Sequence, residues 1–260
     1  MKHQARKRFG QNFLQDQNII DNIVAAINPG PTDCLVEIGP GLGALTYPVL
    51  QQAGQLDVIE LDRDIIPHLQ AGASGLGELR IHSHDALKFD FDSLVRSAQS
   101  MKVFGNLPYN ISTPLIFHLF KSAGSIEEMH FMLQKEVVDR MAANPGSKQY
   151  GRLSIMTQYY CQAIKLFEVP PSAFRPAPKV FSAIVRLRPY DVKPLVAEDE
   201  KLLSDVVTTA FNYRRKTLRN ALKTYLIEPD FSQLGLEISA RPEQLSVKDF
   251  VQISNYLTNK

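Results

Sequence analysis

The sequence predicts an α/β protein in which a doubly wound, mostly parallel sheet is followed by a small helical C-terminal domain. Short apolar segments alternate with segments of helical periodicity, and after residue 198 the periodicity is purely helical. In addition, polar side chains come at the ends of successive apolar segments. These residues are Glu37, Glu60, Asp85 and Asn106. Since ligands bind beyond the carboxyl ends of parallel strands, we expect the four side chains to share one site.

The individual elements follow from the apolar pattern in chain order. A helix is expected at residues 18–27, because isoleucines and a valine recur there at helical spacing before Asn28-Pro29-Gly30. Strands are expected at residues 34–38, 56–60, 79–82, 102–105, 130–133 and 182–187. Further helices are expected to begin near Leu45 and to span residues 65–70 and 115–121.

The C-terminal part is predicted to be a separate helical domain. Residues 189–194, bounded by two prolines, are interpreted as a linker, which divides the chain into domains at 1–188 and 189–260. Beyond the linker, one apolar stripe is expected to run along the helices: Val207, Ala210, Phe211, Leu218, Ala221, Leu222 and Tyr225. Arg215, Arg219 and Lys223 recur every four residues and are therefore predicted to share one outward helical face.

The composition is that of an ordinary globular chain, since 44% of its 260 residues are hydrophobic and 22% are charged. No apolar run approaches the roughly 18 residues of a membrane helix, so no membrane partner is expected. The basic start has no following apolar stretch and is not interpreted as a signal peptide. Cys34 and Cys161 lie far apart and favour a reduced, cytoplasmic compartment.

Positive charge is concentrated in two segments although the net charge is only +2. One is the N-terminal arm, residues 1–8, and the other is residues 211–223; neither contains an acidic residue. The cations assigned to a binding surface are Lys7, Arg8, Arg214, Arg215, Lys216, Arg219 and Lys223. Two such segments predict a polyanionic partner, although either alone could be a solvated basic face.

A glycine-rich turn with Gly39, Gly41 and Gly43 follows the first predicted strand. Glycines let the backbone approach a ligand closely, and Gly39, Gly41 and Ala44 also fit the G-x-G-x-x-G/A pattern of a dinucleotide site. Glu37 disfavours a dinucleotide because a carboxylate would repel its pyrophosphate; it favours a cationic ligand such as S-adenosylmethionine. Glu60 can then accept from both ribose hydroxyls, and Asp85 from the adenine amino group.

The segment Asn106-Leu107-Pro108-Tyr109 follows the fourth predicted strand and indicates the chemistry. An exocyclic adenine amine is a poor nucleophile, and two acceptors aimed at its hydrogens would stabilise the charge that develops during attack. The Asn106 side-chain oxygen and the Leu107 carbonyl can be those acceptors. Pro108 fixes the turn, and Tyr109 offers a ring on which a base can stack. Found alone, the segment could equally be a structural turn with a packed tyrosine.

This segment resembles motif IV of adenine-N6 methyltransferases, and its surroundings resemble the ribosomal RNA adenine dimethyltransferases. Residues 7–14 are similar to that family's N-terminal motif, which implies that Asn12 and Leu14 contact the cofactor. Residues 174–180 resemble its Phe-x-Pro-x-Pro-x-Val loop, which implies that Phe174 lies near the target base. Residues 105–111 and 214–220 most resemble the bacterial small-subunit enzymes. The likeness covers essentially the whole chain.

The resemblance implies a Rossmann-like class I methyltransferase fold, with a catalytic domain and a small RNA-binding domain. It implies dimethylation of two adjacent adenosines in a hairpin loop near the 3′ end of small-subunit (16S) ribosomal RNA, within an immature subunit. The cofactor is expected to be S-adenosyl-L-methionine, the protein a monomer, and no metal site is predicted. A large-subunit resistance-type methyltransferase, a nicotinamide dehydrogenase and a non-catalytic RNA-binding assembly factor remain as alternatives.

Overall fold

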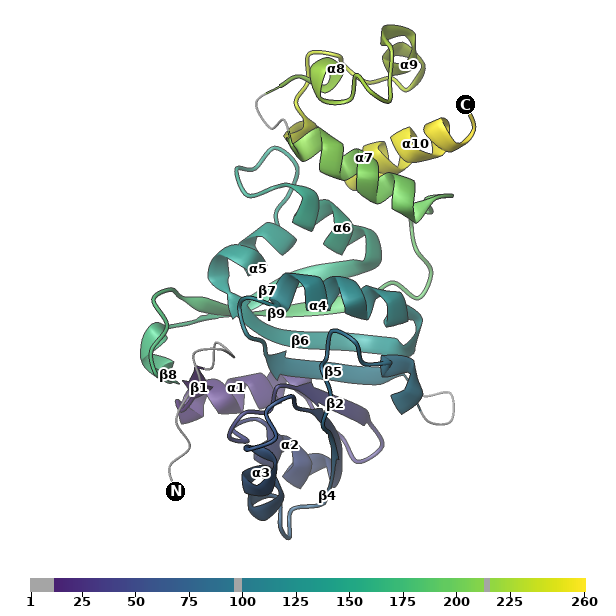
Figure 1. Ribbon diagram of the computed structural model, residues 1–260. Coiled ribbons are helices and arrows are strands. Elements are labelled where there is room, and N and C mark those ends of the chain that lie inside the picture. The colour runs from purple at the N-terminus through teal and green to yellow at the C-terminus, as the bar shows by residue number, and fades with distance from the viewer. Residues whose placement is uncertain (1–11, 96–99, 213–215) are drawn as a thin grey trace. The chain divides into compact units, whose positions relative to one another are not determined.

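The computed structural model describes residues 12–95, 100–212 and 216–260 (Figure 1). By packing, the chain divides into two compact units. The first comprises Met1–Val138 and Ile164–Pro189, and the second comprises Asp139–Ala163 and Tyr190–Lys260. The predicted boundary near residue 189 coincides with the end of the first unit. Residues 139–163, however, cluster with the C-terminal helices, so the second unit is assembled from two separate stretches of chain.

A seven-stranded sheet with the strand order β4-β3-β2-β5-β6-β9-β7 belongs to the first unit, except for residues 161–163 at the start of β7 (Figure 1). The strands are β2 (Cys34–Ile38), β3 (Gln55–Ile59), β4 (Glu78–His82), β5 (Met101–Asn106), β6 (Ile126–Gln134), β7 (Cys161–Val169) and β9 (Ser182–Pro189). Pairing is parallel from β4 to β6, and β9 runs antiparallel to β6. The predicted α/β class is therefore confirmed. The strand β7 was not predicted.

The strand order shows where a ligand is expected to bind at the edge of the sheet. From β2 the chain proceeds through α2 (Thr46–Ala53), β3 and α3 (Ile66–Gly72) to β4, and then returns to β5 on the other side of β2. Because crossover connections are right-handed, α2 and α3 cover one face of the sheet, and α4 (Ser112–Leu119), which joins β5 to β6, covers the opposite face. The point of reversal lies between β2 and β5, where doubly wound sheets bind their ligands.

The helix α1 (Gln17–Ile27) shows how local sequence fixes an element of the first unit. The Asp16 carboxylate caps its start by accepting from the backbone amides of Asn18 and Ile19, and Asn28 ends it in a left-handed conformation with φ 47°. Its apolar face enters one core cluster with residues of α2 and of the sheet: Ile20, Ile23, Val24, Ile27, Val49, Leu50, Leu35, Leu56, Val58 and Phe104. Burying each such side chain contributes about 1.5–3 kcal/mol.

A second, two-stranded sheet in the first unit was not predicted either. It pairs β1 (Phe13–Leu14) with β8 (Phe174–Arg175), and the register places Leu14 opposite Phe174. Short 3₁₀ helices complete the connections: η2 (Phe91–Leu94), η3 (Phe120–Ser125), η4 (Pro171–Ala173) and, in the second unit, η5 (Pro242–Gln244). The two-residue strands carry too little periodicity to be recognised in the sequence.

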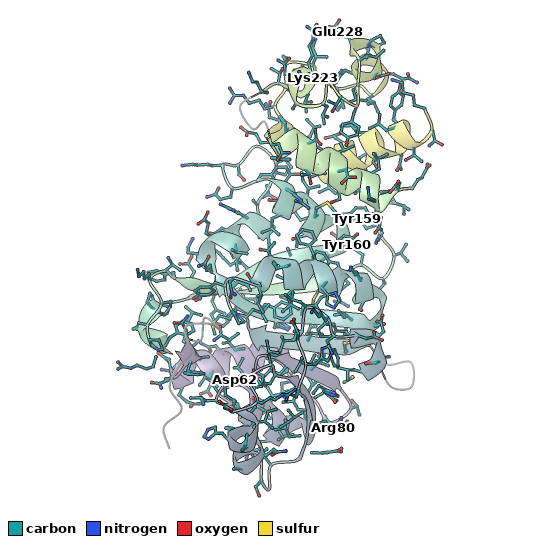
Figure 2. The ribbon with its side chains drawn as sticks, viewed as in Figure 1. Asp62, Arg80, Tyr159, Tyr160, Lys223 and Glu228 are labelled. Carbon is teal, nitrogen blue, oxygen red and sulfur yellow. The ribbon has the colours of Figure 1, made fainter. Side chains whose placement is uncertain are left out.

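The second unit is helical. Its helices are α6 (Arg152–Tyr160), α7 (Glu200–Asn212), α8 (Leu218–Ala221), α9 (Glu228–Gln233) and α10 (Val247–Thr258), and α5 (Lys135–Met141) crosses the boundary between the units. The rings of Phe211 on α7 and Phe250 on α10 lie 6.0 Å apart. Glu200 accepts hydrogen bonds from the hydroxyls of Tyr159 and Tyr160. Both tyrosines are labelled in Figure 2. None of the helices in the described ranges is long and apolar enough to cross a membrane.

The predicted continuous helical stripe through residues 207–225 is wrong. The helix α7 ends at Asn212, and α8 is a separate helix of four residues. At its start, the backbone amides of Leu218 and Arg219 donate to the carbonyls of Ala240 and Ile238 rather than to a preceding turn. Because these tertiary hydrogen bonds replace helical ones, the apolar residues of α8 are buried by a redirected chain and not by a longer α7.

Candidate active site

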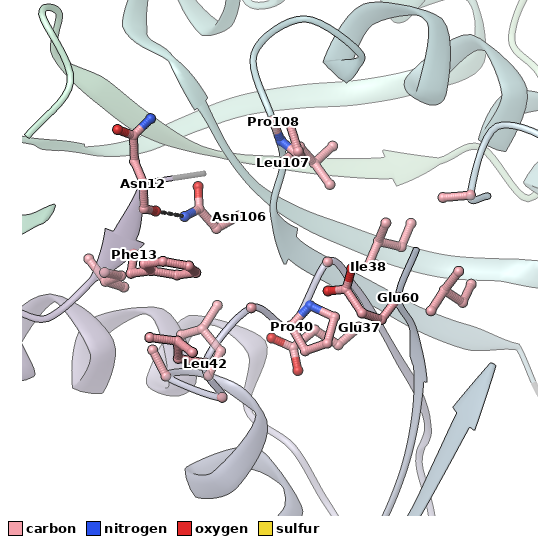
Figure 3. Close-up of a pocket in the computed structure, with 18 of the residues that line it drawn as sticks. Asn12, Phe13, Glu37, Ile38, Pro40, Leu42, Glu60, Asn106, Leu107 and Pro108 are labelled. Carbon is pink, nitrogen blue, oxygen red and sulfur yellow. Dashed lines mark hydrogen bonds between the residues drawn. The ribbon is translucent and has the colours of Figure 1, made fainter. Parts of the chain in front are cut away.

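A cavity of about 760 Å³ lies at the carboxyl edge of β2, β3 and β5, next to the point where the strand order reverses (Figure 3). Its lining includes every residue that the sequence assigned to the cofactor: Asn12, Leu14, Glu37, Gly39, Gly41, Gly43, Glu60, Asp85 and Asn106. Leu107, Pro108 and Tyr109 line it as well. A volume of this size suits a single nucleoside-like ligand with a substituent.

The glycine turn brings backbone rather than side chains to the cavity. Gly39, Gly41 and Gly43 all have positive φ, a conformation that residues with a side chain rarely adopt. At Gly43 space is restricted too, because a Cβ atom would lie 2.4 Å from the ring of Tyr47. The turn leads directly into α2, where Tyr47 donates its backbone amide to the Gly43 carbonyl. Glycine is therefore required both for the turn and for the packing of Tyr47 beside it.

Glu37 is a buried carboxyl group at the second-last residue of β2, with only 2% of its surface exposed. The Thr46 hydroxyl donates to its Oε2 atom over 2.6 Å. Burial raises the pKa of Glu37 to about 8; the bond from Thr46 opposes the rise, and the charge of Glu60 adds to it. A cationic ligand group in the cavity would favour the ionised carboxylate and relieve this perturbation. Glu37 therefore favours a ligand with positive charge.

Glu60 stands directly after β3 and lies deep in the cavity wall (Figure 3). Its Oε1 atom accepts the backbone amide of Asp62 over 2.7 Å, which fixes the side chain. Burial raises the pKa of Glu60, and hydrogen bonds from backbone amides oppose that rise. The next residue, Leu61, lines the cavity although it is 53% exposed. An apolar face beside a carboxylate suits a nucleoside, and sequence analysis did not assign Leu61.

Asp85 lies beyond the end of β4 in the turn after His84. Its Oδ1 atom accepts the backbone amide of Leu87 over 3.0 Å, so the carboxylate is held in a tight turn. The second oxygen of a carboxylate fixed in this way remains able to accept from a ligand.

Asn106 is held in one orientation by the N-terminal segment. Its Nδ2 atom donates to the backbone carbonyl of Asn12 over 3.0 Å, as the dashed line in Figure 3 shows. Within residues 12–95, 100–212 and 216–260, no donor reaches the Asn106 Oδ1 atom. The amide therefore presents an acceptor whose orientation is set by the bond at the opposite end of the same group.

Gly105, which was not assigned to the site, explains why Asn106 can stand where it does. A Cβ atom on Gly105 would lie 2.3 Å from the backbone oxygen of Ile38, so β5 approaches the end of β2 too closely for any side chain. The following peptide is fixed as well, because the Leu107 amide donates to the Met132 carbonyl over 3.2 Å. The signal for Gly105 was its place directly before a polar strand end.

Tyr109 completes the wall on the side of β5. Its hydroxyl is 2.7 Å from the Ser182 Oγ atom at the start of β9, and Ser182 is fully buried. Burial raises the pKa of the Tyr109 hydroxyl, whereas the bond with Ser182 lowers it. The ring is thereby anchored at its polar end and keeps its face for stacking. Ser182 was expected only as a strand residue.

Phe174 is not brought to the cavity. It is 2% exposed, pairs opposite Leu14 between β1 and β8, and belongs to the core cluster. Leu14 itself lines the cavity, so Phe174 lies behind the wall and not on its surface. A direct contact between Phe174 and a base therefore requires a movement of β8, and its role at the target base stays a prediction.

The basic residues assigned to a binding surface are only partly described. Lys7, Arg8, Arg214 and Arg215 lie outside the described residues. Lys216, Arg219 and Lys223 are exposed. Arg219 pairs with Glu228 over 2.8 Å, and both side chains are more than half exposed. Lys223 and Glu228 are labelled in Figure 2.

Comparison with known proteins extends these observations. Residues 2–259 match the ribosomal RNA adenine dimethylase family. A protein of Shewanella frigidimarina named ribosomal RNA small subunit methyltransferase A is 57% identical over 258 residues, which cover 99% of this chain and 96% of the relative. The protein of the same name from Shewanella woodyi is 55% identical over 258 residues, with 99% and 97% coverage.

Two solved structures share the fold over nearly the whole chain. A dimethyladenosine transferase from Plasmodium falciparum has a TM-score of 0.82 and 26% identity, covering 95% of this chain and 98% of its own. A 23S rRNA methyltransferase, ErmE, has a TM-score of 0.75 and 22% identity, covering 95% of this chain and 100% of its own, and shows the fold alone. With its family match spanning residues 2–259, this chain belongs to the ribosomal RNA adenine dimethylase family.

Proposed function

We propose that this protein is an S-adenosylmethionine-dependent methyltransferase that converts two adjacent adenosines of small-subunit ribosomal RNA to N6,N6-dimethyladenosine. The observation that carries the proposal is the fixed acceptor at Asn106, in the wall of a cavity that is also lined by the buried carboxyl of Glu37 on the neighbouring strand. A cationic methyl donor and a neutral amine acceptor are the two reactants that such an arrangement would bring together.

The donor set fits S-adenosylmethionine. Glu37, buried and hard to ionise alone, would be stabilised as a carboxylate by the positive charge of the cofactor's ammonium and sulfonium groups. Glu60 can accept from the ribose hydroxyls, Leu61 can cover a face of the adenine, and Asp85 can accept from its amino group. The bound cofactor supplies an activated methyl group. The glycine turn leaves room for this ligand against the backbone.

The residues of the target side activate and orient the amine. The Asn106 Oδ1 atom and the Leu107 carbonyl can accept its two hydrogens, so that the nitrogen becomes more tetrahedral and its developing positive charge is stabilised. Tyr109, anchored by Ser182, can hold the base by stacking. Holding donor and acceptor in line accounts for much of the rate. The amine can lose its proton after transfer, so no strong general base is required.

A second methyl transfer places one further demand on the site. A mono-methylated amine has one hydrogen left, so only one of the two acceptors can be used in the second reaction. Asn106 is fixed by its bond to Asn12, and Leu107 by its bond to Met132. Because each acceptor is held independently, either one can serve alone while the added methyl group takes the place of the lost hydrogen bond.

The RNA substrate is proposed from the relatives' names and from the distribution of charge. Relatives that are 57% identical are named for the small ribosomal subunit. Two basic segments, residues 1–8 and 211–223, suit a large folded RNA. We infer a hairpin loop near the 3′ end of the 16S RNA, presented by an immature small subunit to a monomeric, cytoplasmic enzyme.

Tritium transfer from labelled adenosylmethionine, followed by nucleoside analysis, tests this function. Small subunits from cells that lack the enzyme are expected to incorporate about four methyl groups each, two on each of two adenosines. An isolated hairpin and large-subunit RNA are expected to be poor substrates. Preferential labelling of large-subunit RNA would indicate a resistance-type enzyme, and mono-methyladenosine as the sole product would refute dimethylation. Binding of NAD instead of adenosylmethionine would refute the cofactor.

A further inference from the structure

The start of β9 lies at the same edge of the sheet as the cavity. The strand β6 runs parallel to β5, so its last residue, Gln134, stands at the carboxyl edge close to Asn106. Because β9 is antiparallel to β6 and its first residue, Ser182, pairs with Gln134, β9 begins at this edge. The residue before it, Phe181, therefore stands at the rim of the site.

Phe181 is unusual in its exposure. It is 50% exposed, which makes it the most exposed phenylalanine or tyrosine within the described ranges. Its neighbour Val180 is 44% exposed. An exposed aromatic ring at the rim of a pocket has no explanation in the packing of the fold, and such rings are typical of surfaces that bind another molecule.

The backbone around Phe181 is fixed although its ring is exposed. The Phe181 carbonyl accepts the backbone amide of Lys135 over 2.9 Å. On the other side, the Ser182 hydroxyl bonds to Tyr109, whose ring lines the cavity. Consecutive Cα atoms are about 3.8 Å apart, so Phe181 stands one residue away from the anchor of Tyr109. The backbone of Phe181 is consequently held at a defined place beside the proposed target pocket, and half of the residue is open to another molecule.

The loop that leads to Phe181 adds positive charge. Arg175 and Lys179 are both exposed, and within the ranges that the structure describes neither forms an ion pair. Pro176 and Pro178 restrict the backbone between them. Exposed cations together with an exposed aromatic ring are the combination with which proteins bind single-stranded nucleic acid, phosphates on the cations and a base on the ring.

We propose that Phe181 forms a second nucleotide subsite, on which an unpaired base next to the target adenine stacks, while Arg175 and Lys179 contact the adjoining phosphates. This inference rests on the proposed RNA substrate. It assigns the base beside the target a separate platform, outside the pocket that holds the reacting amine. The subsite would position the strand and would not touch the reacting atoms.

The kinetic test compares Phe181→Ala with Phe181→Tyr, and uses Val192→Ala as a control because Val192 is an exposed apolar residue (86%) of the second unit. With immature small subunits, we expect Phe181→Ala to raise KM about 5- to 150-fold, the usual effect of removing one base–aromatic stack. We expect kcat and adenosylmethionine affinity to stay unchanged, and Phe181→Tyr and Val192→Ala to resemble the wild type. A KM within twofold of wild type in Phe181→Ala would overturn the proposal.

A binding test uses the absence of tryptophan from this chain. In Phe181→Trp the new indole is the only one, so its emission reports on position 181 alone. We expect protein-free small-subunit RNA to quench it, and to leave the emission of Val192→Trp unchanged. No quenching, or equal quenching in both variants, would contradict base stacking. If Phe181→Ala raised KM for small subunits but free RNA did not quench Phe181→Trp, the ring would contact a ribosomal protein instead of a base. That result would overturn the proposal.

The two hypotheses fail in different ways. If the wild-type enzyme methylates none of the RNAs, the proposed function fails. If the wild type methylates small subunits and Phe181→Ala does so equally well, the proposed function stands and only the second subsite is refuted. A mutant that neither folds nor binds adenosylmethionine is replaced by Phe181→Ser in the same comparison, because a polar side chain is well tolerated at an exposed position.

Discussion

At the ends of β2 and β3 the cavity wall carries two buried carboxyl groups, whereas at the end of β5 it carries a neutral amide, a proline and a tyrosine. Glu37 and Glu60 both have raised pKa values because burial disfavours their charge. Asn106 and Tyr109 are instead held by single hydrogen bonds, to Asn12 and Ser182. The part of the wall at β2 and β3 is thus suited to a positive charge, and the part at β5 to a neutral amine.

This difference separates binding from chemistry. Carboxyl groups kept in a buried environment interact with a cation whether or not a reaction follows, so their removal should weaken cofactor binding. A neutral acceptor gains most when positive charge develops on the attacking nitrogen, so its removal should slow the chemical step.

The largest effect is expected for Asn106→Ala. The variant loses the acceptor aimed at the amine and also the bond to the Asn12 carbonyl. We expect methyl transfer to fall about 10²-fold or more in single-turnover experiments, with the Kd for RNA and for adenosylmethionine within a few-fold of wild type. Asn18→Ala, on the exposed side of α1, is the matched control. If the loss appeared in cofactor affinity instead, the division between the two parts of the wall would not hold.

A smaller effect, on binding, is expected for Glu60→Ala. Removal of a charged acceptor for two ribose hydroxyls should cost about 1.5–3 kcal/mol, which weakens adenosylmethionine binding roughly 10- to 150-fold. Glu127→Ala provides the control, because Glu127 is exposed near the amino end of β6. Isothermal titration measures both. Unchanged affinity in a folded Glu60→Ala protein would remove this residue from the cofactor site.

How far the sequence predicted this site depends on the direction of the strands. Glu37, Glu60, Asp85 and Asn106 lie at or just beyond the ends of parallel strands, so their shared edge could be inferred from order alone. Ser182 and Phe181 reach the same edge at the beginning of an antiparallel strand, and the sequence does not reveal that reversal. The sequence therefore indicated the residues at the ends of the parallel strands, but not the hydrogen bond between Tyr109 and Ser182, which depends on the antiparallel strand β9.

The remaining differences arise from tertiary packing. Phe174 has the sequence setting of an exposed loop residue, yet the pairing of β1 with β8 buries it. Of the residues predicted to share one helical face, Arg215 lies outside the described residues, and Lys223 lies beyond the end of α8 at Ala221. The amides of residues 218 and 219 donate to carbonyls of the 238–240 segment instead of extending a longer helix. Periodicity describes a local preference, and contacts between segments far apart in sequence override it. Pairings of this kind leave no short-range pattern.

Glu37 makes the part of the cavity wall at β2 and β3 sensitive to pH. Its pKa is raised to about 8 in the folded protein from an ordinary value near 4.5, so the folded state binds a proton that the unfolded state has lost. The associated stability is complete below about pH 4.5 and is lost as the pH rises through 8, by up to about 1.4 kcal/mol per pH unit. Glu37→Gln should remove this dependence.

Two measurements check this prediction. Between pH 6 and 9, the melting temperature of the ligand-free wild type should fall more than that of Glu37→Gln. Over the same range, adenosylmethionine affinity should rise in the wild type, since the cation binds the carboxylate and displaces its proton, and should change less in the variant. Parallel pH profiles for wild type and variant would show that Glu37 stays ionised without a ligand.

The smallest effect is expected for Arg219 and Lys223 of the second unit, because they are proposed to bind RNA phosphates and to take no part in cofactor binding or methyl transfer. The Arg219 side chain forms an exposed ion pair with Glu228, an interaction of about 0–1 kcal/mol that a phosphate could replace, and Lys223, four residues further along the chain, is exposed as well. Replacing both by alanine should flatten the slope of log K against log salt by about 1.4–1.8, since each lost phosphate contact contributes about 0.7–0.9.

Lys201→Ala, which removes an exposed lysine paired with Asp205 on α7, should leave the slope unchanged. If Lys201→Ala had an equal effect, the dependence on salt would reflect overall charge and not a defined contact surface. Because phosphate contacts position RNA without reading its sequence, kcat at saturating RNA should be the same in all three proteins.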